Sequence, residues 1–221
     1  MTGNKIQIIA CDTVIKEMLP FMSQGVSHRS VESGLHLRPE RLKAELQRII
    51  DETTDLADTI ILGFGLCSMA VIGLRAAKST LVIPRQDDCI GIFLGSRDRY
   101  KEELKKEPGT YFLSRGWIDA KITLVDEFNE TVKRHDREIA ERVMKLILKH
   151  YTRLAFINTG HQDQNHYVEF SRSAAKKFGL CYDEIPGKTE LLKKICQGPW
   201  DEEFVVVPPG RKIRLEDFDM L

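Results

Sequence analysis

Three cysteines each follow an apolar run of the kind that forms a buried β-strand. The cysteines are Cys11, Cys67 and Cys89, and the apolar runs before them are residues 8–10, 60–62 and 81–83. In a parallel α/β sheet, the loops at the carboxyl ends of the strands gather at one edge, where ligands bind. We therefore expect the three thiols to meet at a single site.

The chemistry that suits three thiols is binding of a soft metal. Thiolate ligands select zinc or iron–sulfur clusters, and three protein ligands leave one coordination position open, as in catalytic sites. The chain has none of the Cys-x2-Cys pairs of a structural zinc knuckle. We expect Cys11, Cys67 and Cys89 to hold an iron–sulfur cluster or zinc, with a corrinoid as the less favoured cofactor. The alternative is that they are buried thiols acting as small hydrophobic groups. Cys181 and Cys196 lie outside the pattern of strand-end cysteines, and we interpret both as structural.

Two charged residues lie between the third apolar run and Cys89. Arg85 could clamp the carboxylate or phosphate of a small anionic ligand or substrate through two hydrogen bonds. Asp88, directly before Cys89, is a candidate proton carrier. We assign both as catalytic candidates and expect at least one to face the thiols. The alternative for both is an ordinary salt bridge at a strand end.

Four further residues are candidates for binding a cofactor. Gly63 and Gly65 let the loop before Cys67 turn sharply and approach a ligand closely, and amides near Ser68 would stabilise an anion at the start of a predicted helix. The spacing Gly63-x-Gly65-x-x-Ser68 is one glycine short of the dinucleotide fingerprint, a weaker interpretation. His161, in a polar loop after a strand, is a possible fourth ligand or acid/base group. It is otherwise a solvated loop residue.

The order of elements predicts an α/β protein. Apolar runs that read as strands alternate with amphipathic segments that read as helices, which is typical of a mainly parallel sheet flanked by helices, with recurring strand–loop–helix units. We predict one domain over 1–221, with subdivisions near 1–57, 58–150 and 151–221. The predicted strands are 5–10, 58–63, 80–84, 110–113, 154–158 and 203–207. The predicted helices are 13–22, one from residue 39, 68–77, 97–106, 134–150, 170–178 and 189–196. Residues 23–37 are predicted as a loop, and 90–94 as a helix or short strand.

Composition limits the classes of partner. The 221 residues include 33 basic and 33 acidic side chains, so the chain lacks the basic excess of a nucleic-acid-binding protein. No apolar stretch approaches the ~18 residues of a membrane span, and the first residues lack the apolar core of a signal peptide. Five cysteines cannot all pair with one another. We expect a cytoplasmic protein with free thiols and no nucleic-acid or membrane partner.

A specific phrase runs through the middle of the chain. It comprises residues 63–67, 82–85, 88–90, 94–97, 108–111 and 116–118. This phrase resembles the domain-of-unknown-function family 1638 of methanogens and other anaerobes, and the resemblance extends to residues 9–11 and 204–210. The family pattern has cysteines at the positions of Cys11, Cys67 and Cys89, whereas its common glycine after the second cysteine is Ser68 here. The resemblance implies anaerobic one-carbon or methylamine metabolism, with corrinoid methyltransferase components as possible partners.

Three functions stay open at this stage. The first is an enzyme that uses the open metal position as a Lewis acid on a small organic acid, amine or methyl donor. In this enzyme, Arg85 would be the anchor and Asp88 the proton carrier. The second is a non-catalytic accessory protein that binds or delivers a metal, cluster or corrinoid to a methyltransferase system. The third is an α/β binding module with buried free thiols.

Overall fold

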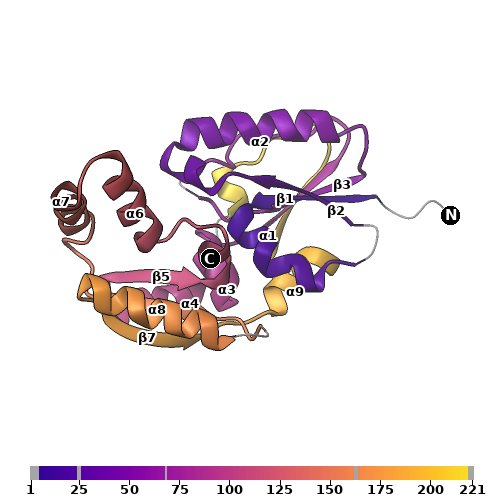
Figure 1. The fold of residues 1–221 in the computed structure, drawn as a ribbon. Coiled ribbons are helices and arrows are strands. Elements are labelled where there is room, and N and C mark those ends of the chain that lie inside the picture. Colours follow the sequence, from indigo (N-terminus) through magenta and orange to yellow (C-terminus); the bar gives the residue numbers. More distant parts are fainter. Residues whose placement is uncertain (1–4, 24–25, 68, 162–163, 219–221) are drawn as a thin grey trace. The chain divides into compact units, whose positions relative to one another are not determined.

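The chain forms two compact units, each with its own β-sheet (Figure 1). In a computed structural model, which describes residues 5–23, 26–67, 69–161 and 164–218, unit 1 comprises Met1–Arg97 and Thr189–Leu221, and unit 2 comprises Asp98–Lys188. The predicted α/β class is confirmed: both sheets are wholly or mostly parallel and are flanked by helices. That the two units make one domain stays a prediction.

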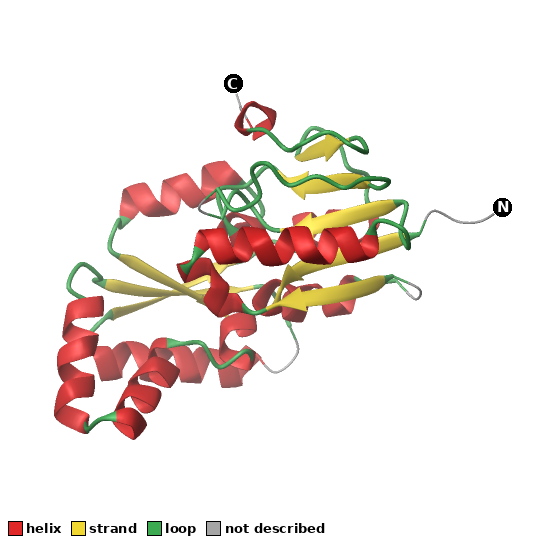
Figure 2. Cartoon of the chain, turned by 90° about the horizontal axis from the view of Figure 1, so that it is seen from above, coloured by secondary structure: helices red, strands yellow, loops and turns green. Residues whose placement is uncertain are grey.

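Unit 1 is built on a five-stranded sheet with the order β2-β1-β3-β4-β8. The first four strands are parallel and β8 is antiparallel to β4. The carboxyl ends of β1, β2, β3 and β4 therefore lie at the same edge of the sheet, whose strands are seen side by side in Figure 2. The strands are β1 (Ile6–Cys11), β2 (Ser27–Val31), β3 (Thr59–Gly63), β4 (Thr80–Pro84) and β8 (Phe204–Val207).

Helices cover both faces of this sheet, so its central strands are apolar on both sides. Helix α2 (Pro39–Thr53) packs on one face, with Leu42, Leu46 and Ile50 fully buried along one stripe. Helices α1 (Asp12–Met18) and α9 (Glu190–Gln197) lie on the other face (Figure 1). The short helix α3 (Cys89–Leu94) follows β4, and 3-10 turns complete the unit at Leu19–Phe21, Ser33–Leu37 and Leu215–Phe218.

Unit 2 holds a three-stranded parallel sheet with the order β5-β6-β7. Helix α8 packs against β6 and β7, and helices α6 and α7 pair with each other. None of the helices in the described part of the chain combines the length and apolarity needed to cross a lipid bilayer. The elements are α4 (Arg97–Lys106), β5 (Thr110–Ser114), α5 (Arg115–Asp119), α6 (Leu124–Arg134), α7 (Arg137–Ile147), β6 (Arg153–Asn158), α8 (Gln164–Phe178) and β7 (Cys181–Pro186).

Two strands lie where the sequence predicts none. Strand β2 lies within the predicted loop 23–37, and β7 follows α8 where no strand is predicted. Both are edge strands, and only Val31 of β2 is buried. A strand with one paired edge and mostly exposed side chains has no apolar pattern, so periodicity alone does not reveal it.

One helix prediction is wrong and another is too long. The described residues between Cys67 and β4 form turns rather than a helix, because Cys67, Met69 and Gly73 adopt left-handed φ angles of 44°, 68° and 87°. The helix predicted over 134–150 is the shorter α7, which Asp136 caps by accepting a hydrogen bond from the Ile139 amide. The preceding helix, α6, ends at Arg134.

Candidate thiol site

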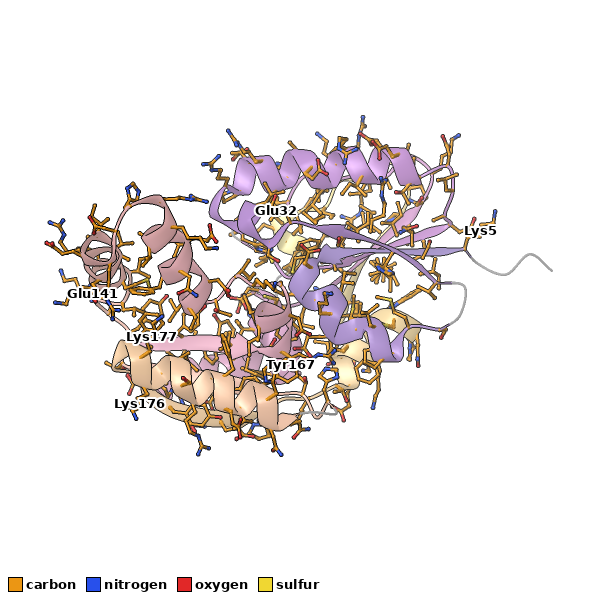
Figure 3. All side chains as sticks on the ribbon, viewed as in Figure 1. Lys5, Glu32, Glu141, Tyr167, Lys176 and Lys177 are labelled. Carbon is orange, nitrogen blue, oxygen red and sulfur yellow. The ribbon has the colours of Figure 1, made fainter. Side chains whose placement is uncertain are left out.

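All three cysteines that follow predicted strands lie in unit 1, at the carboxyl edge of its parallel strands. Cys11 is the last residue of β1, Cys67 follows β3 across residues 64–66, and Cys89 is the first residue of α3 after β4. Cys11 and Cys67 are buried, Cys89 is partly buried, and all are free thiols. Figure 3 labels Glu32 near this edge, after β2, and Lys5 at the opposite end, before β1.

The three thiols interact with one another electrostatically. Burial is the main cause that raises the pKa of Cys11, Cys67 and Cys89. Negative charge on Cys11 or Asp88 raises the pKa of Cys67 and of Cys89 further, and Cys67 does the same to Cys89. The thiols and the Asp88 carboxylate therefore lie within electrostatic range of one another. With no cation present, all three thiols are neutral at pH 7.

The loops that carry Cys67 and Cys89 are held together by their backbones. The Leu66 amide donates to the Gln86 carbonyl at 2.9 Å, and the Cys67 amide donates to the Asp87 carbonyl at 3.0 Å. This approach requires glycine at 65, because a Cβ there would lie 2.6 Å from the Gln86 oxygen. Gly65 thus brings two protein segments together, and its predicted contact with a cofactor stays a prediction.

Gly63 serves a related purpose inside the sheet. A Cβ at Gly63 would lie 2.7 Å from the Cβ of Ala10, its neighbour on β1. Glycine at 63 therefore lets β3 pass Ala10 directly before Cys11. Its predicted approach to a ligand also stays a prediction.

We expect Gly65→Ala to destabilise the chain by about 1–3 kcal/mol, because the added methyl group overlaps backbone atoms that a rotamer change cannot move. The matched control is Gly34→Ala, where the nearest atom is a Glu32 side-chain oxygen at 3.5 Å. The measurement is the urea midpoint of both variants. Equal midpoints would contradict the close approach of the two loops.

Arg85 and Asp88 face different partners. The Arg85 guanidinium donates from Nε to the Phe204 carbonyl at 3.2 Å and from Nη1 to the Asp217 carbonyl, so it fixes the C-terminal segment. Asp88 caps α3 by accepting from the Ile90 amide at 2.8 Å, and its charge acts on Cys67 and Cys89. Of the two, Asp88 is the residue that the fold places in the electrostatic field of the thiols. Their catalytic roles stay predictions.

The remaining predicted residues are not brought into this cluster. Ser68 lies outside the described residues. His161 belongs to unit 2, where it lines an open pocket with Gln164, Asn165, His166 and Tyr167. Since turns rather than a helix fill the described residues 69–79, the strand–loop–helix context that the dinucleotide fingerprint requires is missing.

Three residues at this edge were not predicted. Ser33 and His36 lie in the 3-10 turn after β2, and Gln86 follows β4. The His36 ring lies against Phe64, with ring centroids 6.0 Å apart and planes tilted by 32°, and burial lowers the His36 pKa, so its imidazole is neutral at pH 7. The sequence did not indicate Ser33 and His36 as site residues, because the edge strand β2 that positions them has no apolar pattern. Gln86 offered a usable signal, since it lies at a strand end three residues before Cys89.

Thiols are suitable ligands for a soft metal, but the three cysteine side chains are not positioned as a set of metal ligands. Within residues 5–23, 26–67, 69–161 and 164–218, no three His, Cys, Asp or Glu side chains are grouped so that they could hold a metal ion. The Cys11 sulfur instead lies 2.9 Å from the Thr13 hydroxyl oxygen, in a buried hydrogen bond. Joint ligation by Cys11, Cys67 and Cys89 therefore requires the thiols to move from these positions.

We expect the cation-free chain to lose stability as pH rises above the ordinary thiol pKa of 9.0. The folded thiols keep protons that the unfolded chain releases, so unfolding becomes more favourable with each pH unit. Each retained proton contributes about 1.4 kcal/mol per pH unit, so Cys11, Cys67 and Cys89 together contribute up to about 4 kcal/mol per pH unit, and Cys196, whose pKa burial raises to about 12, adds one further proton. The measurement is the urea midpoint between about pH 8 and pH 10. In Cys67→Ser, the pH dependence of the free energy of unfolding should correspond to one retained proton fewer. An unchanged pH dependence would contradict a raised pKa for the Cys67 thiol.

Comparison with known proteins identifies the family. A family model described as "Protein of unknown function (DUF1638)" matches residues 30–196, more than half of the chain. The chain belongs to the DUF1638 family. The matched DUF1638 region contains Cys67 and Cys89 and takes in unit 2, whereas Cys11 lies before it. No curated protein and no solved structure matches the chain significantly.

Proposed function

We propose that this DUF1638 protein binds a soft metal ion or an iron–sulfur cluster through Cys11, Cys67 and Cys89. The observation that carries the proposal is that three adjacent strands deliver three free thiols to one edge of the sheet, where Cys11 and Cys67 both act electrostatically on Cys89. Thiolates are the ligands that zinc and iron–sulfur clusters prefer. A cation at this edge would offset the burial and the negative charge that raise the thiol pKa values, so metal binding and thiol deprotonation would occur together.

The bound group would supply a Lewis acid or a redox centre. Around it, Cys11, Cys67 and Cys89 would act as ligands, and Asp88 would hold or move a proton beside them. In an enzyme of this kind the substrate is a small organic acid or amine. Free thiols also suit a reducing compartment such as the cytoplasm.

A second candidate is a non-catalytic accessory protein that carries or delivers a metal, cluster or corrinoid. One observation favours it: Arg85, the predicted anchor for an anionic substrate, donates to the main-chain carbonyls of Phe204 and Asp217. The resemblance noted from the sequence suggests a methyltransferase system of anaerobic one-carbon metabolism as the recipient.

The test is purification of the full chain without oxygen, followed by assays of metal and acid-labile sulfide per chain and an absorption spectrum. Iron with sulfide and a brown colour would select the cluster. One zinc per colourless chain would select the metal ion. A chain that holds neither, and takes up neither after anaerobic reconstitution, would refute the proposal.

A further inference from the structure

Unit 2 contains a pocket of about 430 Å³, lined by residues of α6, of α8 and of α7 together with the residue that follows α7. A volume of this size is typical of a site for a small molecule. The lining lies wholly within unit 2 and includes none of the cysteines, so the pocket is a separate site from the proposed metal.

The floor of this pocket is apolar. It is formed by Met144, which is 4% exposed, and by the partly buried side chains of Phe128, Leu148 and Phe178. The Phe128 and Phe178 rings meet edge to face, with centroids 6.1 Å apart. An apolar group that entered the pocket would remove exposed parts of these side chains from water, which favours binding.

The other side chains of the lining are charged, and positive charge dominates. Three basic residues and one acidic residue, Arg137, Lys145, Lys177 and Glu141, give the lining a net charge of +2. Arg137 and Glu141 pair with each other at 3.0 Å. Among the described residues, neither Lys145 nor Lys177 forms an ion pair with a carboxylate. The pocket therefore has two ammonium groups available for an anion.

Lys177 shows that a cation lies directly beside the apolar floor. Its Nζ atom is 4.0 Å from the centroid of the Phe128 ring and 5.3 Å from that of Phe178. These cation–π contacts hold the ammonium group in place and leave its charge unneutralised. Figure 3 labels Lys177 and Glu141 in the region of α7 and α8, with Lys176 on another side of α8.

We propose that this pocket binds a small carboxylate with an apolar chain, of the size of a medium-chain fatty acid. The chain lies on Met144 and the two phenylalanine rings, and the carboxylate pairs with Lys145 and Lys177. A cationic ligand is repelled by both lysines. The Glu141 carboxylate in the same lining disfavours a doubly charged phosphate more than a singly charged carboxylate.

The probes are octanoate, octylammonium with the opposite charge, octyl phosphate with a larger negative charge, and acetate without a chain. Each is titrated to about 10 mM, because ligands of this size bind in the millimolar range. The signal is the methyl resonance of Met144 in protein labelled with ¹³C at its methionine methyl groups. The reference is the methyl resonance of Met18, which is fully buried in unit 1. Each resonance is assigned by its absence in the corresponding leucine variant.

We expect octanoate to shift the Met144 resonance and to leave the Met18 resonance in place. Octylammonium and acetate should shift neither at the same concentration. No shift of Met144 with octanoate, an equal shift with octylammonium, or tighter binding of octyl phosphate than of octanoate would overturn the proposal.

Charge variants provide a second readout. Lys145→Gln and Lys177→Gln should each weaken octanoate binding about fivefold or more, because each removes a charge-assisted contact to the carboxylate. The matched control is Lys176→Gln, the same charge change on a neighbouring residue outside the lining, and it should leave octanoate binding unchanged. An equal loss in Lys176→Gln would show general charge attraction and overturn the site. Wild-type protein without metal would refute only the metal, and failure to bind octanoate would refute only this pocket.

Discussion

Serine at any one of Cys11, Cys67 and Cys89 should abolish stoichiometric metal or cluster binding. Loss of a residue that only hydrogen-bonds to a metal ligand already lowers metal affinity about 10- to 100-fold, so loss of a direct ligand should lower it at least ~100-fold. The effects should not add, because a site with one ligand missing is already disabled. The measurement is metal per chain, supported by a Co²⁺ titration without oxygen, in which thiolate ligation gives intense absorption.

The matched control for these variants is Cys196→Ser. Cys196 is buried in the same unit, and burial alone raises its pKa to about 12. Serine there carries a comparable folding cost but removes no proposed ligand. Cys181→Ser, on exposed β7 in unit 2, is a second control. If Cys196→Ser lost as much metal as Cys67→Ser, the effect would be one of folding and the site would not exist.

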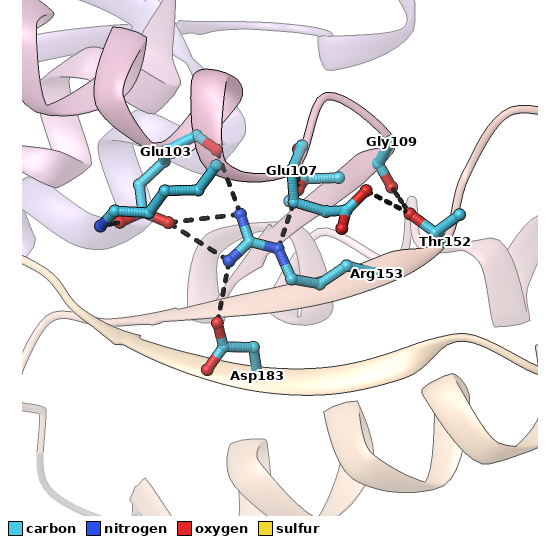
Figure 4. A network of polar contacts seen from close by, with 8 residues as sticks. Glu103, Glu107, Gly109, Thr152, Arg153 and Asp183 are labelled. Carbon is cyan, nitrogen blue, oxygen red and sulfur yellow. Dashed lines mark hydrogen bonds and ion pairs between the residues drawn. The ribbon is translucent and has the colours of Figure 1, made fainter.

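Arg153→Met should destabilise unit 2 by about 3 kcal/mol, because it leaves a buried carboxylate without its guanidinium partner. Arg153, 12% exposed, bonds Glu103 at 3.2 Å and Asp183 at 2.8 Å (Figure 4). It also donates from Nε to the Thr110 hydroxyl at 2.9 Å. The network therefore ties α4 to all three strands of the sheet. The measurement is amide hydrogen exchange along β6, which reports on unit 2 alone.

Two further variants separate the buried charge from the side chain itself. Arg153→Met combined with Glu103→Leu removes both charges and should recover most of the stability, since an apolar pair often replaces a buried ion pair without loss. Arg137→Met removes a pair with Glu141 whose side chains are 81% and 55% exposed, and it should change stability by no more than about 0.5 kcal/mol. A double variant as unstable as Arg153→Met would contradict this account.

The sequence alone determined the central part of the fold. A strand that is buried on both faces has a continuous apolar run in the sequence. For this reason β1, β3 and β4 lie within one or two residues of their predicted bounds. Three such strands in an α/β pattern imply a parallel sheet, and a parallel sheet implies that Cys11, Cys67 and Cys89 follow strands at a common edge. The family could also be recognised from the sequence, because its characteristic motifs lie in the chain itself.

Only the tertiary structure decided what surrounds the thiols. The Leu66 and Cys67 amides donate to the Gln86 and Asp87 carbonyls, and the described residues after Cys67 form turns where a helix was predicted. The antiparallel strand β8 returns from the far end of the chain and gives Arg85 main-chain partners instead of a free guanidinium. The polar strand β2 carries Ser33 to the site edge. Each of these depends on backbone hydrogen bonds between distant segments, and such bonds leave no periodic trace in side-chain type because every residue can make them.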